Sequence, residues 1–109
     1  MSCYQEGQVW HYRTRPGEER SLVKIQRIEE SPAADETIFH ISLIRLAWRF
    51  GDALPHAPVS RSTLDRSVTH LAAVFPDFPS VEDGIAEWKR ASGGVYAVSL
   101  AEIVEMGDF

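Results

Sequence analysis

Histidine is the side chain best suited to bind a metal or move a proton near neutral pH. This chain has four histidines, His11, His40, His56 and His70, and no two of them form a His-x-His or His-x-x-x-His pair. Because a metal site needs several ligands within about 2 Å of one ion, this spacing predicts no metal site, and we expect no cofactor. His11 and His40 fall on predicted strands, and the sequence leaves open whether they meet.

Aromatic and arginine side chains gather near the start of the chain. Trp10 and Tyr12 fall on the same face of a predicted strand, with Arg13 and Arg15 close by. An exposed cluster of Trp, Tyr and Arg is typical of a recognition hot spot, so these four residues are candidate binding residues. The alternative interpretation, which we favour for Trp10, is that it belongs to the core of the sheet.

Nucleophilic and acid–base catalysis find no support in the sequence. It contains no Gly-x-Ser-x-Gly elbow, and Cys3 is the only cysteine. Neighbouring carboxylates occur at 18–19 and 29–30, which flank turns, and at 82–83, where a helix is expected to begin and acids favour its dipole. We therefore predict no catalytic residue.

The formal net charge of -5 is concentrated in the last third of the chain. Residues 1–36 hold 7 acids and 5 bases, residues 37–75 hold 2 and 4, and residues 76–109 hold 7 and 2. This distribution lacks the basic stripe that binds phosphates, so a nucleic-acid partner is disfavoured and a basic protein partner is favoured. No apolar run has the length of a signal peptide or of a membrane span, which predicts a cytoplasmic protein without a membrane partner.

The first part of the chain carries strand signals. The ranges 8–14, 21–29 and 37–46 are rich in β-branched and aromatic residues, and Arg15-Pro16-Gly17-Glu18 between the first two predicts a type II turn. Alternation along the third range places Phe39, Ile41 and Leu43 on one face. The other face is mixed, which is typical of a central strand. These ranges predict a curved antiparallel meander, which could close into an SH3-like barrel.

The second part of the chain carries helix signals. Gly51, Pro55 and Pro58 argue against a long regular element between 48 and 59. A helix is predicted from Ser60 or Ser62 to about residue 75, on the apolar spacing of Leu64, Val68, Leu71, Ala72 and Phe75.

Three further elements complete the prediction. The range 80–92 predicts a second helix that Gly93-Gly94 ends, and 95–98 predicts a fourth strand returning to the sheet. The pair Ser99 and Glu102 forms a capping box, so a last short helix is expected over 100–106. The fold predicted is α+β, one domain over residues 1–109, with a curved antiparallel sheet packed by two to three helices.

Several runs together resemble a family of small uncharacterised bacterial proteins with no assigned activity. They are the segments 12–18 and 40–42, His56-x-Pro58-x-Ser60, and the segment 94–99. The resemblance spans nearly the whole chain and implies a stand-alone bacterial domain, with no activity or site residue to transfer.

Two classes of function follow. The first, which we favour because nucleophilic and acid–base catalysis find no support, is a non-enzymatic interaction or regulatory protein of the immunity type, with a basic partner. The second is a small ligand-binding or enzymatic domain with a sheet-face pocket around His11, His40 and His56. Of these, His40 and His56 are candidate binding residues.

Overall fold

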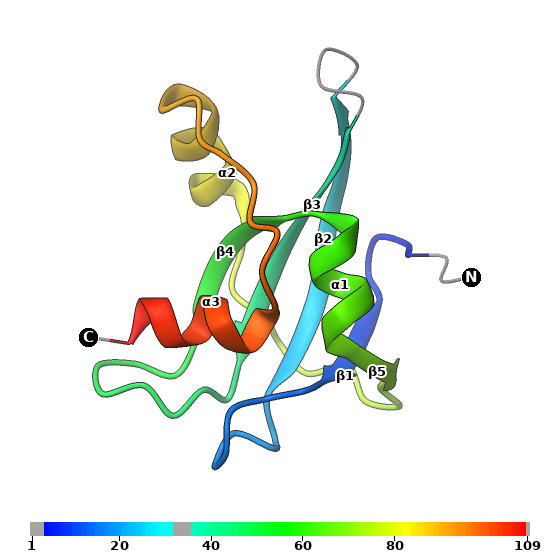
Figure 1. The fold of residues 1–109 in the computed structure, drawn as a ribbon, viewed down its shortest axis with the longest axis vertical. Helices are drawn as coiled ribbons and strands as arrows, with labels where there is room; N and C mark the ends of the chain where they lie inside the picture. The colour runs from blue at the N-terminus through cyan, green and yellow to red at the C-terminus, as the bar shows by residue number, and fades with distance from the viewer. Residues whose placement is uncertain (1–3, 32–35, 109) are drawn as a thin grey trace.

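The fold consists of an antiparallel sheet and three helices (Figure 1). The computed structural model describes residues 4–31 and 36–108, so Cys3 and most of the predicted connection at 31–35 lie outside the described residues. The elements are β1 (Val9–Tyr12), β2 (Leu22–Ser31), β3 (Glu36–Ile44), β4 (Leu54–Val59), α1 (Arg61–Ser67), β5 (Val68–Leu71), α2 (Glu82–Arg90) and α3 (Leu100–Gly107). The predicted α+β class is confirmed.

The sheet has five strands in the order β4-β3-β2-β1-β5, and every neighbouring pair is antiparallel. The three predicted strands are confirmed as β1, β2 and β3, and the longest pairing joins β2 to β3. Gly17 has φ +90 and the Glu18 amide donates to the Arg15 carbonyl at 3.1 Å, which confirms the predicted turn. β4 and β5 are edges, so the sheet does not close into the SH3-like barrel that the sequence allowed.

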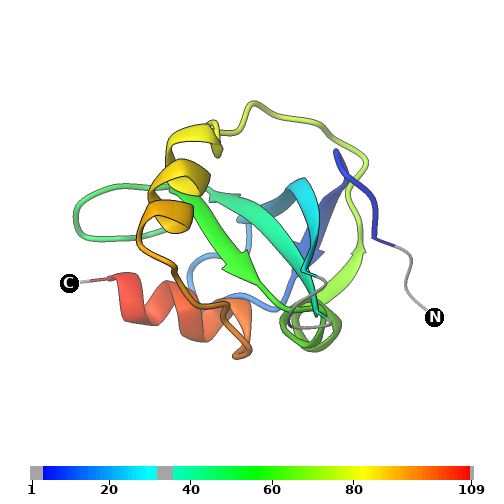
Figure 2. The same cartoon turned by 90° about the horizontal axis from the view of Figure 1, so that it is seen from above.

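The main core lies on one face of this sheet, between the strands and the helices α1 and α3 (Figure 2). The predicted apolar face of β3 is confirmed, since Phe39, Ile41 and Leu43 are all at most 1% exposed. The helices contribute Leu64, Leu100, Ile103 and Val104 to the same cluster. Burial of these aliphatic and aromatic side chains stabilises the fold by about 25 cal/mol per Å² of apolar surface removed from water.

The opposite face of the sheet is covered by α2 and by the extended segment that leads to it (Figure 2). A second apolar cluster lies here, formed by Val9, Leu22, Ile44 and Ala72, with Phe78 packed against it. β3 therefore has two buried faces. The second one also carries His40 and Ser42, which are both fully buried, so their polar atoms need partners inside the protein.

The prediction argued against a long regular element between 48 and 59, and it missed the short strand β4 that residues 54–59 form. Pro55 and Pro58 lower strand propensity, but a proline fits an edge strand where its missing N–H breaks no ladder bond. β4 pairs with β3 on one side, with Ala57 opposite Ile41, and on the other side meets only an isolated bridge from Tyr96. Its buried residues Ala57 and Val59 contribute to the main core.

The helix predicted from 60 to 75 is also wrong beyond residue 67. Ser60 caps α1 as expected, accepting a hydrogen bond from the Thr63 amide at 3.2 Å. The chain then turns into β5, which pairs with β1 and leaves Leu71 and Phe75 of the predicted stripe 53% and 75% exposed. The β-branched pair at 68–69 and the free edge of β1 favour a strand, and these nonlocal hydrogen bonds outweigh the helical spacing.

The C-terminal elements follow the prediction with one exception. α2 forms within its predicted range, α3 ends one residue beyond its predicted range, and the capping box of Ser99 and Glu102 is present. The strand predicted at 95–98 is wrong, because this segment makes only a single parallel bridge between Tyr96 and Val59. The Tyr96 amide donates to the Pro58 carbonyl at 2.9 Å, and the Tyr96 carbonyl accepts from the Ser60 amide at 2.8 Å.

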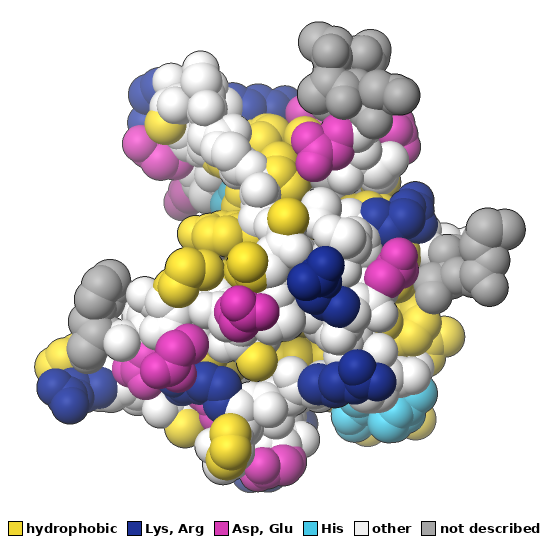
Figure 3. Space-filling model, viewed as in Figure 1, with side chains coloured by type: hydrophobic (Ala, Val, Ile, Leu, Met, Phe, Trp, Pro, Cys, Tyr) yellow, Lys and Arg dark blue, Asp and Glu magenta, His cyan; other side chains and the backbone are white. Residues whose placement is uncertain are grey.

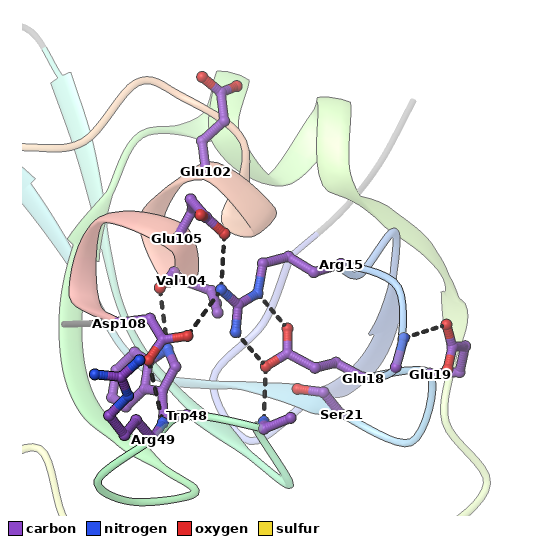
Figure 4. A network of polar contacts seen from close by, with 12 residues as sticks. Arg15, Glu18, Glu19, Ser21, Trp48, Arg49, Glu102, Val104, Glu105 and Asp108 are labelled. Carbon is purple, nitrogen blue, oxygen red and sulfur yellow. Dashed lines mark hydrogen bonds and ion pairs between the residues drawn. The ribbon is translucent and has the colours of Figure 1, made fainter.

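One ion-pair network ties the β1–β2 hairpin to α3 and to the β3–β4 connection (Figure 4). The Arg15 guanidinium donates twice to Glu18, at 2.8 and 2.9 Å, and also to Glu105 and Asp108. Glu18 is only 2% exposed and also accepts from the Ala47 amide at 2.7 Å. These hydrogen bonds, from Arg15 first, hold the pKa of Glu18 below its usual value.

The burial of Ile41 generates the first prediction. Ile41→Ala should lower the free energy of unfolding by about 2–5 kcal/mol, because it leaves a cavity in the main core. Urea unfolding measures the change, and Phe50→Ala, at a side chain that is 84% exposed, serves as the control. A loss below about 1 kcal/mol for Ile41→Ala would contradict the assigned face.

The Arg15 network generates the second prediction. Arg15→Ala should cost about 3 kcal/mol of stability, because it leaves the buried Glu18 carboxylate without its main partner. Arg13→Ala is the matched control: Arg13 is exposed and should change stability by less than about 0.5 kcal/mol. Equal losses from the two variants in urea unfolding would show that the network contributes nothing specific.

Candidate functional site

The two histidines His40 and His56 meet on the α2 side of the sheet. His40 lies opposite Pro58 in the β3–β4 register, so His56, two residues earlier on β4, projects from the same face. Nδ1 of His40 is 2.8 Å from Nε2 of His56, the ring centroids are 5.1 Å apart and the rings are inclined by 23°. The centroid separation matches the N···N distance plus one ring radius at each end, so the imidazoles meet edge to edge through a hydrogen bond.

Glu29 on β2 completes this polar chain. Its Oε1 lies 3.3 Å from Nε2 of His40 and 3.7 Å from Nζ of Lys89. An ionised carboxylate only accepts hydrogen bonds, so Nε2 of His40 carries the proton and its Nδ1 accepts from His56. That assignment leaves the lone pair of His56 on Nδ1. The result is a directional chain from His56 through His40 to Glu29.

α2 lies directly over the histidine pair. Trp88 contacts the His40 ring edge-on, with centroids 5.0 Å apart and an interplanar angle of 76°. Gly84 approaches His56 so closely that a Cβ at this position would lie 2.4 Å from the His56 Cβ. A glycine inside a helix destabilises the helix by about 1 kcal/mol relative to alanine. The close approach to His56 explains why a glycine nevertheless occupies position 84.

Both histidines are neutral at pH 7. Burial lowers the pKa of His40, and the hydrogen bond and charge of Glu29 only partly oppose this. Burial, together with the neighbouring His40, lowers the pKa of His56 to about 4. A neutral pair fits the N–H···N hydrogen bond, because two imidazolium rings would have no acceptor between them.

This arrangement is suited to proton sharing and hydrogen bonding. The nitrogens of His40 and His56 face each other at 2.8 Å, which leaves no space for an ion bound to both at about 2.0–2.1 Å. Within residues 4–31 and 36–108 no three His, Cys, Asp or Glu side chains gather as a metal-ligand set. The pair can therefore accept a proton or a hydrogen bond at Nδ1 of His56. The expectation that the protein binds no metal stays a prediction.

Two neighbouring pockets adjoin the site, and Tyr96 lines both of them. The larger, of about 450 Å³, is lined by Pro58, Trp88, Gly93, Gly94, Val95 and Tyr96. The smaller, of about 220 Å³, is lined by Trp48, Leu54, His56, Ala57, Tyr96, Ile103, Met106 and Gly107. We call these two pockets together the Tyr96 groove. Figure 3 shows hydrophobic side chains gathered on this face, between α2 and α3.

The predicted aromatic and arginine cluster does not form an exposed surface. Tyr12 is buried in the main core, where its hydroxyl lies 2.7 Å from Ser21 Oγ, and burial raises its pKa to about 12. Trp10 is half-buried against the same core, as our favoured interpretation had it. Arg15 is occupied by the ion-pair network, so Arg13 alone of the four is exposed.

The predicted trio of histidines is brought together only in part. His40 and His56 touch, whereas His11 stands opposite His70 on the β1–β5 pair. Glu29, Gly84 and Tyr96 also belong to the site, and the sequence did not predict them there. An unexplained glycine inside the predicted helix 80–92 was the one signal that pointed toward it.

The lowered pKa values of the histidine pair generate a pH prediction. Between pH 6.5 and about 4 the unfolded chain takes up a proton at His56 while the folded chain does not, so stability should fall as the pH drops through this window. His56→Gln should flatten the slope of unfolding free energy between pH 7 and pH 5, and Phe50→Ala, which removes no titratable group, should leave it unchanged. An unaltered slope for His56→Gln in urea unfolding would contradict the burial of this imidazole.

Comparison of the chain with protein-family models, with curated proteins and with solved structures finds no match. In the part of the chain that the structure describes, no helix is both long and apolar enough to cross a membrane. The resemblance to an uncharacterised bacterial family therefore stays a prediction, and the geometry of the site is the basis for a functional proposal.

Proposed function

We propose that the protein is a non-enzymatic interaction module that binds a basic segment of a partner protein in the Tyr96 groove. The observation behind this proposal is the composition of the groove: Trp88, Tyr96, Trp48 and Met106 line adjoining pockets on one face. Trp and Tyr are enriched among residues that dominate binding energy, and Met adapts to varied partners. Tyr96, 41% exposed, and Met106, 55% exposed, leave apolar surface for a partner to cover.

The size of the groove fits side chains of a partner chain. The larger pocket, at about 450 Å³, lies in the range of about 300–1,000 Å³ that is usual for ligand sites. The smaller pocket adds about 220 Å³ on the other side of Tyr96. Two adjoining pockets suit an extended segment that places one apolar side chain in each.

Charge supports a basic partner. Residues 80–108, which include α2 and α3, hold six acids against Lys89 and Arg90. Several of these acids are in ion pairs, namely Glu82 with Arg27, Glu87 with Arg90, and Glu105 and Asp108 with Arg15. Asp83 and Glu102 have no ion-pair partner among the described residues, and Figure 4 shows Glu102 pointing away from the Arg15 network. These two acids are available to attract lysine and arginine.

A small-molecule or enzymatic function is the second candidate, and His56 is the observation that favours it. His56 lines the smaller pocket, and its Nδ1 has no hydrogen-bond partner among the described residues. A neutral imidazole backed by His40 and Glu29 is a suitable acceptor or general base. No nucleophile of the described chain hydrogen-bonds to His56, which is why we place this candidate second.

Binding of the purified protein to an array of short random peptides tests the proposal. We expect enrichment of peptides that combine aromatic or aliphatic residues with Lys or Arg. Tyr96→Ala should weaken binding of the best peptide by about 2 kcal/mol or more, roughly 30-fold in Kd, because it removes the side chain shared by both pockets. The backbone hydrogen bonds of this residue remain, so the variant should fold.

Two further variants sharpen the result. Phe50→Ala, which removes an exposed aromatic outside the groove, should bind like the wild type. Asp83→Asn combined with Glu102→Gln should slow association and reduce its salt dependence, and the glutamine preserves the capping box. Absence of enriched peptides, or equal losses from Tyr96→Ala and Phe50→Ala, would reject the proposal and favour the small-molecule candidate.

A further inference from the structure

A second histidine pair lies on the opposite edge of the sheet. His11 on β1 and His70 on β5 stand directly across from each other, and their rings stack with centroids 4.3 Å apart and planes inclined by 16°. His70 is exposed and His11 is half-buried. We propose that this pair is a low-affinity site for a transition-metal cation of the Cu²⁺ or Ni²⁺ class, with water completing the coordination.

The backbone fixes the spacing that such a site requires. Directly opposite residues of an antiparallel pair have Cβ atoms about 4.5–5.5 Å apart, so two imidazoles at these positions can reach one ion. Binding needs each ring to turn until its nitrogen lies about 2.0–2.1 Å from the metal. The torsion that turns a histidine ring is broad, and both rings have solvent beside them, so this movement is inexpensive.

The hydrogen bonds leave suitable nitrogens free. Nδ1 of His70 lies 3.1 Å from the Thr69 hydroxyl, which leaves Nε2 as the ligand atom and helps to orient the ring. No hydrogen bond to the His11 ring is present among the described residues. The His40–His56 pair differs in this respect, because its facing nitrogens are engaged with each other.

The chemistry of two imidazoles selects the metal. Imidazole suits Cu²⁺, Ni²⁺ and Zn²⁺, whereas Mg²⁺ and Ca²⁺ prefer oxygen ligands, and affinity rises from Ni²⁺ to Cu²⁺ for a given site. Two protein ligands make an exchangeable site, which is compatible with a protein purified without stoichiometric metal. Both rings must be neutral to bind, so affinity should fall as the pH is lowered.

Quenching of tryptophan fluorescence by Cu²⁺ tests the site, because Trp10 directly precedes His11. We expect saturable quenching with one ion per chain at neutral pH, and its loss over the same Cu²⁺ range in His11→Ala and in His70→Ala. His56→Gln should bind like the wild type, and Trp10→Phe should bind Cu²⁺ with a smaller optical signal. Electron paramagnetic resonance of the bound Cu²⁺ should show two coordinating imidazoles.

A thermal-shift series provides an independent readout. Ni²⁺ should raise the melting temperature of the wild type, since an ion bound across β1 and β5 stabilises the folded state, and Mg²⁺ should not. His70→Ala should remove the Ni²⁺ effect. Cu²⁺ affinity that is unchanged in both histidine variants, or a Ni²⁺ shift that survives His70→Ala, would place binding elsewhere on the chain and overturn the proposal.

Discussion

The burial of β3 on both faces is the constraint on which most of this structure depends. One face supplies Phe39, Ile41 and Leu43 to the main core, while the other places His40 at 0% exposure beneath α2. A fully buried imidazole must satisfy both ring nitrogens, and Glu29 and His56 on the two flanking strands do so. α2 covers the pair, with Trp88 against the His40 ring and Gly84 against His56. Trp88 also lines the larger pocket of the Tyr96 groove.

The other wall of the groove depends on the Arg15 network. Arg15 joins the hairpin to Glu105 and Asp108 at the end of α3, and Trp48 Nε1 donates to the Val104 carbonyl at 3.0 Å (Figure 4). These contacts fix α3 against the β3–β4 connection, so that Met106 and Trp48 line one pocket. Arg15, which the sequence suggested as a binding residue, therefore stabilises the position of α3 beside the proposed binding groove. The physical reason is the buried Glu18 carboxylate, which is stable only with a cation beside it.

The two histidine pairs show how one residue type acquires different properties from its surroundings. His40, fully buried, and His56, half-buried, meet edge to edge beneath α2, share a hydrogen bond and are held neutral by burial. His11 and His70 stack on an edge of the sheet that water reaches, with nitrogens left for an external ligand. The first pair organises structure around the proposed binding groove. The second is open to ions, and this difference in solvation separates a structural hydrogen bond from a candidate metal site.

Local signals in the sequence determined the features that depend only on neighbouring residues. Alternation predicted the buried face of β3, Pro16-Gly17 predicted the turn, and Ser60 and Ser99 predicted the helix starts. The tertiary structure alone decided which strand each histidine faces, that Val68–Leu71 extends as β5 beside β1, and that Tyr96 docks against β4. The reason is that register and edge pairing depend on hydrogen bonds between segments far apart in the chain. These hydrogen bonds outweigh the helical spacing in 68–71, and the edge position of β4 accommodates its prolines. No local sequence pattern encodes either outcome.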